Sequence, residues 1–312
     1  MTGYILKRLL QTVVVLWGVS VVTFILMNIV PGDPVLLMLE KRATPEAVER
    51  VRREMGLDRP KIAQYAGFLS RAVRLDLGRS YFTRAPVMAT LTRRFGVTLR
   101  LASSAYAAAL VLGVSAGVAA ALKRGRAFDS IVTGCSVLGI SAPVFWIAII
   151  LQMIFGLRLG WLPISGVHSP GSFVLPAAAL GAHYMASISR LTRTSVLEAI
   201  SQDYIRTARA KGLAERAVVL RHALRNALIP IVTLSGAELG NLLAGSMLTE
   251  WVFAIPGIGK LMVDSILMRD LPMLQGTVLY VAVVFVLTNL AVDISYAFID
   301  PRVRYGGGER RH

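Results

Sequence analysis

Long uncharged stretches alternate with short polar segments along the chain, and their lengths predict membrane-spanning helices. About 20 consecutive apolar residues cross a bilayer as a helix. Six stretches approach or exceed this length: 9–30, 101–122, 130–157, 173–189, 226–249 and 276–298. Charged residues interrupt only the last two, at Glu238 and Asp293. The pattern therefore predicts an all-α integral membrane protein with six transmembrane helices, the third of them kinked at Pro143.

Residues 31–98, between the first two predicted spans, are polar but keep helical periodicity. Thr44 is suited to cap a helix that has Pro45 at its first position, and Gly56 is suited to end it. Pro60 is suited to open a second helix. The pattern predicts a helical insertion on the outer side of the membrane.

The segment between the fourth and fifth predicted spans, residues 195–230, is basic and amphipathic. Apolar positions follow helical spacing in its first half at Val196, Ala199 and Ile200, and in its second half at Ala217, Leu220, Leu224 and Leu228. Gly212 lies between the halves, where a helix can end in a left-handed residue. The segment is predicted to form two short helices that turn at Gly212.

The distribution of basic residues predicts the topology. The chain has 312 residues, 55% of them hydrophobic, and a net charge of +16. With the N-terminus inside, the cytoplasmic segments hold 17 of the 34 Lys and Arg, and the two short outer loops hold three. The positive-inside rule then places both termini in the cytoplasm. The remaining fourteen fall between Lys41 and Arg100, in an outer segment long enough to escape the rule, so the charge does not call for a nucleic-acid partner.

Several strings resemble one transporter family. YIRTARAKGL (204–213) and RHALRNALIP (221–230) resemble the coupling loop of ABC-transporter permease subunits of the dipeptide and oligopeptide branch. PGDP at 31–34 and Asp300-Pro301-Arg302 near the C-terminus are also similar to that family. The broader family pattern begins with Glu, and Arg206 stands at that position here, whereas its glycine is kept at Gly212.

The resemblance implies that the coupling loop, residues 191–228, docks into a groove on an ATP-hydrolysing subunit. Gly212 would permit the turn, apolar side chains would fill the groove, and basic ones would meet acidic groups. The groove-filling candidates are Tyr204, Ala208, Ala210 and Leu213, and the basic candidates are Arg206, Arg209 and Lys211. Binding of this basic surface to anionic lipid is the alternative that residue chemistry alone leaves open.

The resemblance also implies a set of partners and a location. The chain would be one permease subunit of a peptide-type importer in the bacterial inner membrane. It would pair with a homologous second permease, two ATP-binding subunits and an extracytoplasmic solute-binding protein. ATP and magnesium would bind to the ATPase subunits, with no cofactor in this chain. The implied parts are a first helix at 1–30, the insertion at 31–98, and a five-helix permease core at 99–312.

The insertion is interpreted either as a cap that meets the solute-binding protein or as a membrane-surface subdomain without a partner of its own. Family members import dipeptides, oligopeptides, glutathione and nickel complexes. The strings at 265–275 and 295–305 are most similar to the glutathione and dipeptide members.

Ionisable groups within a membrane are costly and are functional candidates by default. Glu238, in the middle of the fifth predicted span, either lines the translocation pathway or pairs with His183 or Asn241. The four histidines lack metal-ligand spacing, and no nucleophile lies in a pattern with a base, so we expect no catalysis. The remaining alternatives are a secondary transporter or channel that acts without an ATPase, and a membrane scaffold that recruits a soluble enzyme.

Overall fold

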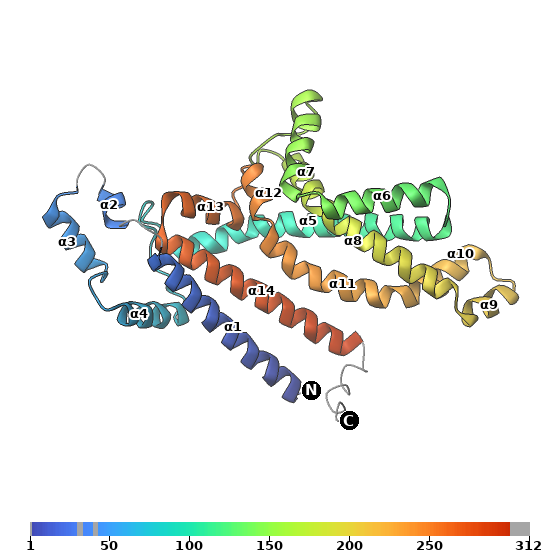
Figure 1. Cartoon of the computed structure of the whole chain (residues 1–312), viewed down its shortest axis with the longest axis horizontal. Helices are drawn as coiled ribbons and strands as arrows, with labels where there is room; N and C mark the ends of the chain where they lie inside the picture. The colour runs from blue at the N-terminus through green and yellow to red at the C-terminus, as the bar shows by residue number, and fades with distance from the viewer. Residues whose placement is uncertain (1, 30–33, 40–42, 300–312) are drawn as a thin grey trace. The chain divides into compact units, whose positions relative to one another are not determined.

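The computed structural model describes residues 2–29, 34–39 and 43–299 (Figure 1). In this part of the chain every regular element is a helix, and the only β-pairing is an isolated bridge between Arg79 and Pro86. The α-helices are α1 (Thr2–Ile29), α2 (Pro34–Leu39), α3 (Pro45–Glu54), α4 (Lys61–Val73), α5 (Val87–Leu122), α6 (Ala127–Ser141), α7 (Val144–Leu151), α8 (Val174–Ile200), α9 (Asp203–Ala210), α10 (Glu215–Ala217), α11 (Leu224–Gly245), α12 (Met247–Val252), α13 (Ile258–Met268) and α14 (Leu271–Ile299). Two π-helices, η2 (Gln152–Arg158) and η4 (Val218–Ala223), and a 3-10 helix, η3 (Pro170–Phe173), complete the set.

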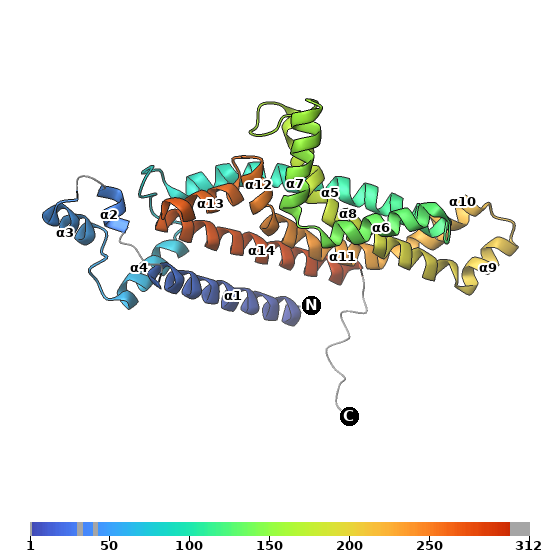
Figure 2. The ribbon, with the colours of Figure 1, turned by 45° about the horizontal axis from the view of Figure 1, so that its top comes forward.

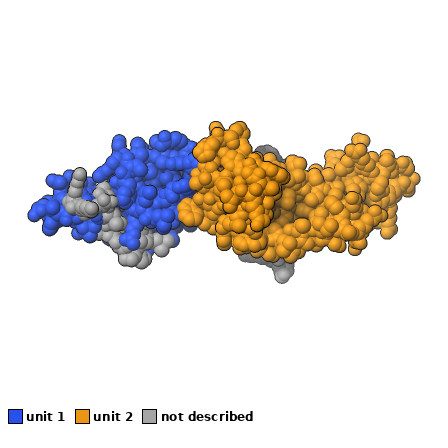
Figure 3. Space-filling model, turned by 90° about the horizontal axis from the view of Figure 1, so that it is seen from above, with its two compact units in different colours: residues 1–97, 256–290 blue, residues 98–255, 291–312 orange. Residues whose placement is uncertain are grey.

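The chain divides into two compact units (Figure 3). The first unit contains residues 1–97 and 256–290, and the second contains residues 98–255 and 291–312. Each unit is described separately below.

In the first unit, α3 and α4 of the insertion begin where the sequence predicted. The Thr44 side chain accepts a hydrogen bond from the Ala47 amide at 3.3 Å, and α3 begins with Pro45. Gly56 has a positive φ of 65° just after α3, and α4 begins directly after Pro60. Both helix starts and the glycine stop are therefore confirmed.

The first unit has a small core that joins the end of the insertion to later helices. Val87 and Leu91 of α5 form a buried cluster with Ile258 of α13 and Met273 of α14. Asp270, immediately before α14, strengthens this junction: it accepts hydrogen bonds from the Ser80 hydroxyl at 2.5 Å and the Tyr81 amide at 3.1 Å. The segment that leads into α5 is thus fixed to the start of α14.

The second unit is organised around α8, which packs against α6, α7 and α11 (Figures 1 and 2). Glycines let α5 approach α8 closely. A Cβ atom built on Gly113 would lie 2.9 Å from the Met185 carbonyl oxygen, and one on Gly117 would lie 2.5 Å from that of Ser189. The small residues of α5 therefore permit close contact between these two helices.

The third predicted span is not a single kinked helix. The helix stops at Ser141, and Ala142 takes an extended conformation with ψ of 132°. The pair formed by 127–141 and 144–158 is bent by 110°, and α7 leaves the line of α6 steeply (Figure 2). A residue before proline avoids the helical region of backbone angles, and Pro143 has no backbone N–H to donate. The helix therefore breaks at Ala142-Pro143.

Among the described residues, three helical segments are long and apolar enough to cross a membrane by themselves: Arg8–Ile25, Val87–Leu122 and Leu271–Val292. The bent pair of α6 and α7 provides a fourth if it counts as one span. α8 has 27 residues, and α11 has 22. At 1.5 Å per residue, each exceeds the roughly 30 Å thickness of a hydrocarbon core. α8 runs on to Ile200, well past residue 189, where the fourth span was predicted to end.

Candidate functional site

The coupling loop, residues 191–228, contains the break predicted at Gly212. The backbone of Gly212 is left-handed, with φ of 75°, and it separates α9 from the helical run of α10, η4 and α11. The first half of the loop differs from the prediction because it holds two helices. α8 ends at Ile200, and Gln202 is extended with ψ of 152° before α9 begins.

A buried apolar cluster holds α9 against η4, and we call residues 203–223 the α9–η4 hairpin. Ile205 and Ala208 of α9 pack with Val218 and Ala223 of η4 and with Ala199 at the end of α8. Ile205, Val218 and Ala223 are completely buried. Burial of a large apolar side chain contributes about 1.5–3 kcal/mol, so the hairpin is folded by contacts within its own chain.

An ion pair closes the hairpin across its turn. The Arg209 guanidinium donates to both carboxylate oxygens of Glu215, at 2.6 and 3.1 Å, and Gly212 lies between them in the chain. These bonds lower the pKa of Glu215 and raise that of Arg209. Both side chains are about half exposed, so solvent screening reduces the contribution of the pair to stability.

The predicted docking residues fall into two groups. Tyr204, Arg206, Ala210, Lys211 and Leu213 are all exposed. Ala208 is only 6% exposed, because it faces the buried cluster. The outer surface of the hairpin therefore carries the basic and aromatic side chains of the predicted set.

A hollow of about 400 Å³ lies between residues of the hairpin and the start of α11. The sequence analysis did not predict that its lining residues come together. Tyr204, Arg221, His222, Arg225 and Asn226 line it. Arg221 and Arg225 are four residues apart, as are His222 and Asn226, and this spacing places each pair on neighbouring positions of a helix face. That spacing is the signal from which the set could have been predicted.

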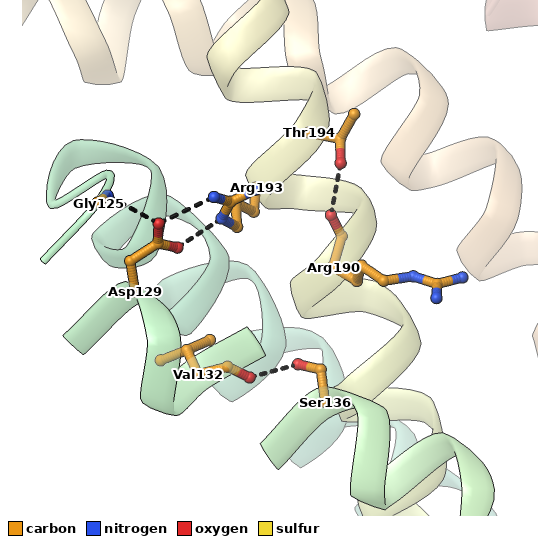
Figure 4. Close-up of polar contacts among 7 residues, drawn as sticks. All are labelled: Gly125, Asp129, Val132, Ser136, Arg190, Arg193 and Thr194. Atoms are coloured by element: carbon orange, nitrogen blue, oxygen red, sulfur yellow. Dashed lines mark hydrogen bonds and ion pairs between the residues drawn. The ribbon is translucent and has the colours of Figure 1, made fainter. Parts of the chain in front are cut away.

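A second charged contact, also missed from the sequence, lies where the loop between α5 and α6 meets α8 (Figure 4). The Arg193 guanidinium donates to both oxygens of Asp129 at 2.5 and 2.9 Å, and the Gly125 amide donates to one of them at 3.0 Å. Asp129 precedes the uncharged run 130–157. The bonds from Arg193, followed by the one from Gly125, lower its pKa to about 2. The pair fixes the first turn of α6 to α8, two turns before α8 ends.

The candidate pathway residues lie on two packed helices. His183 is on α8, beside Tyr184 with ring centroids 5.5 Å apart, and Glu238 is on α11 within electrostatic range of the Tyr184 hydroxyl. Both are partly buried. Asn241 is also on α11, but its side chain lies outside the described part of the structure.

Glu250 of α12 is a buried carboxylate that the sequence analysis did not single out. It is completely buried and accepts hydrogen bonds from the hydroxyls of Thr98 at 2.7 Å and Ser246 at 3.0 Å. Elsewhere in the described residues, no three His, Cys, Asp or Glu side chains gather as a metal site would require.

Two sequence families cover nearly the whole chain. Residues 109–305 match the binding-protein-dependent transport system inner membrane component, and residues 1–102 match the N-terminal part of the same membrane component.

Individual proteins agree with this assignment. A putative peptide transport system permease protein of Brucella abortus is 44% identical, with 98% of this chain and 100% of the relative covered. The glutathione transport system permease protein GsiC of Escherichia coli is 43% identical with the same coverage.

Two solved structures share the fold. An amino acid ABC transporter structure gives a TM-score of 0.52 at 15% identity, with 69% of this chain and 94% of that chain covered. The inward-facing MetNI methionine ABC transporter gives a TM-score of 0.52 at 20% identity, with 68% and 97% covered. The chain therefore belongs to the family of binding-protein-dependent inner membrane components, and it is a multi-pass permease subunit of an ATP-binding-cassette importer.

Proposed function

We propose that this permease forms half of a translocation pathway for peptides or glutathione and couples it to ATPase subunits through the α9–η4 hairpin. The hairpin carries the proposal because it is folded by its own buried cluster and exposes Tyr204, Arg206, Lys211 and Leu213 outward. A preorganised surface loses less conformational entropy on docking than a flexible loop would.

Within this proposal, Arg206 and Lys211 meet acidic groups of the ATPase, and Tyr204 and Leu213 fill its groove. Arg209 acts inside the hairpin through its pair with Glu215, and Ala208 through its place in the buried cluster. Gly212 supplies the left-handed turn that holds these residues in position.

The proposed assembly contains this chain, a homologous second permease, two ATP-binding subunits and an extracytoplasmic solute-binding protein. ATP and magnesium bind to the ATPase subunits, and this chain supplies no catalytic group. Six spans cross the inner membrane with both termini in the cytoplasm, and α8 and α11 provide the fourth and fifth spans. The parts are the first helix at 1–30, the extracytoplasmic insertion at 31–98 and the permease core at 99–312.

The proposed mechanism is a population shift between inward- and outward-facing states. ATP closes the ATPase pair, and the hairpin moves with it because the buried cluster resists deformation. The equilibrium shifts only by the difference in docking energy between the two states. His183, Glu238 and Asn241 line the pathway between α8 and α11 in this proposal.

The alternative of a secondary transporter or channel predicts uptake by this chain alone. The deciding experiment reconstitutes the permease in proteoliposomes with and without its ATPase subunits, second permease and binding protein. We expect uptake of labelled substrate only from the complete set with ATP. Uptake by the permease alone, driven by an ion gradient, would contradict the proposal.

The substrate is tested with the same complete assembly. The names of the relatives support glutathione and short peptides as the first ligands to compare. We expect one of these classes, loaded on the binding protein, to stimulate ATP hydrolysis. Stimulation by neither would remove this substrate proposal while leaving the coupling role in place.

A further inference from the structure

The first unit contains a cavity of about 330 Å³ that none of the roles above uses. It lies among the end of α3, one side of α4, residues 77–81 and the first turns of α14. Sites for small molecules in proteins begin at about 300 Å³, so this cavity is large enough for a compact ligand.

The floor of the cavity is apolar and its rim is cationic. Phe68, which is 8% exposed, lies among the lining residues. Three arginines from three different segments line the cavity, Arg59, Arg71 and Arg79, against a single carboxylate, Glu54. The positive charge of Arg71 acts on the Tyr81 hydroxyl, which also lines the cavity. The lining therefore favours an anionic group beside an apolar one.

Gln275, in the second turn of α14, adds an independent observation. Its side-chain nitrogen is buried and has no hydrogen-bond partner among the described residues, and the residue lines the cavity. Buried amide groups in proteins are almost always paired, and an unpaired one calls for an explanation. The nitrogen itself is inaccessible in this conformation, so a ligand oxygen in the cavity would supply the missing acceptor after the Gln275 amide turns toward the cavity.

The walls are held in place by contacts of their own. The Gln64 side chain donates to the carbonyl oxygens of Leu57 and Arg59, which fixes the turn that carries Arg59. On the opposite wall, Asp270 binds Ser80 and Tyr81 next to Arg79. The cavity is thus preformed between segments that are anchored at both sides.

We propose that this cavity binds a small aliphatic carboxylate, with its apolar part against the Phe68 floor and its carboxylate between the arginines and Gln275. Arginine recognises carboxylates through paired donors in a fixed fork. The Gln275 amide donates to the same carboxylate or to a carbonyl beside it. This site lies between the insertion at 31–98 and the start of α14, and it is separate from the coupling loop and the proposed pathway residues.

Binding is tested on the full permease chain in nanodiscs, without any other subunit, so the result is independent of the coupling proposal. The probe is N-acetyl-leucine, and its binding is measured by saturation-transfer NMR and by titration. N-acetyl-leucinamide has the same shape without the charge, and leucine tests whether an added ammonium group is tolerated. We expect N-acetyl-leucine to bind at least about tenfold more tightly than the amide, because the bonds to charged donors are lost. No saturable binding, or equal binding of acid and amide, would overturn the proposal.

Three variants locate the site. Arg71→Gln should weaken binding about tenfold, whereas Arg74→Gln, just past the end of α4 and absent from the cavity lining, should leave it unchanged. Gln275→Leu should also weaken binding, yet keep or raise the thermal midpoint without ligand, because it removes an unpaired amide. Equal effects of Arg71→Gln and Arg74→Gln, or full binding by Gln275→Leu, would place the probe elsewhere and refute the assignment.

Discussion

Replacement of Gly212 by valine tests the role of the left-handed turn in the coupling loop. Gly212 has φ of 75°, and a Cβ atom built on it meets nothing within 4 Å. The substitution therefore causes no clash inside this chain, and its effect comes from the backbone alone. The left-handed conformation costs an ordinary residue roughly 1–2 kcal/mol, and a β-branched residue is especially rare there.

The size of the loss in Gly212→Val depends on the backbone penalty of valine relative to the stability of the hairpin. Burial of Ile205 and Val218 stabilises the hairpin by about 1.5–3 kcal/mol each, before the entropy of ordering them is subtracted. A penalty of 1–2 kcal/mol then lowers the population of the native turn by roughly 5–30-fold if the net stability of the hairpin is small. We expect Gly212→Val to reduce ATP-driven uptake at least about fivefold.

The control is Gly212→Asn, because asparagine is close to valine in size but tolerates the left-handed region. The assay is uptake by the reconstituted importer, normalised to the amount of permease in the membrane, which both variants should leave unchanged. We expect Asn to retain most of the activity that Val loses. An equal loss of uptake in both variants would show that the added side chain obstructs docking to the ATPase. Normal uptake by Gly212→Val would refute the requirement for the left-handed turn.

Three further substitutions test contacts in the second unit. Gly117→Ala should destabilise the chain by about 1–3 kcal/mol in thermal unfolding, because it forces α5 from α8, whereas Gly96→Ala has open space and should not. The pair of Asp129 and Arg193 contributes its full stabilisation at pH values above the ordinary aspartate pKa of about 4. This stabilisation is lost as the pH falls through the lowered pKa of Asp129, about 2. Asp129→Asn should therefore lower the thermal midpoint equally at pH 5.5 and 8, and a pH-dependent difference would contradict this. Ala208→Leu should overpack the buried cluster, expose the hairpin to protease and abolish coupled uptake, and a protease-resistant, active variant would refute the interior role.

Local signals in the sequence predicted several elements correctly because each depends on a few neighbouring residues. The uncharged runs predicted the apolar helices, Thr44 and Pro45 marked the start of α3, and Gly212 marked the turn of the coupling loop. Proline also predicted a disturbance in the third span. The size of the bend there, 110°, was not predictable, because the direction in which a chain continues after a helix break depends on tertiary packing.

Other features depend on residues far apart in the chain. Ser80 and Asp270 are separated by 190 positions, and Glu250 accepts one of its hydrogen bonds from Thr98 across 152 positions. In the coupling loop, the predicted groove-filling set included Ala208 of α9, but the pattern of apolar residues does not tell what covers them. The same pattern serves a helix that docks on a partner and one that packs on its own chain, and Ala208 packs on its own chain.

α8 is one unbroken helix from Val174 to Ile200, and it carries His183 while leading directly into the coupling loop. His183 and Ile200 are separated by 17 positions, or roughly 26 Å at 1.5 Å per residue. A tilt of α8 by about 5° about Ile200 therefore displaces His183 sideways by roughly 2 Å relative to Ile200. An angular change at one end of α8 that is too small to register as a rearrangement of the loop is therefore enough to shift a side chain 17 positions away by more than a bond length.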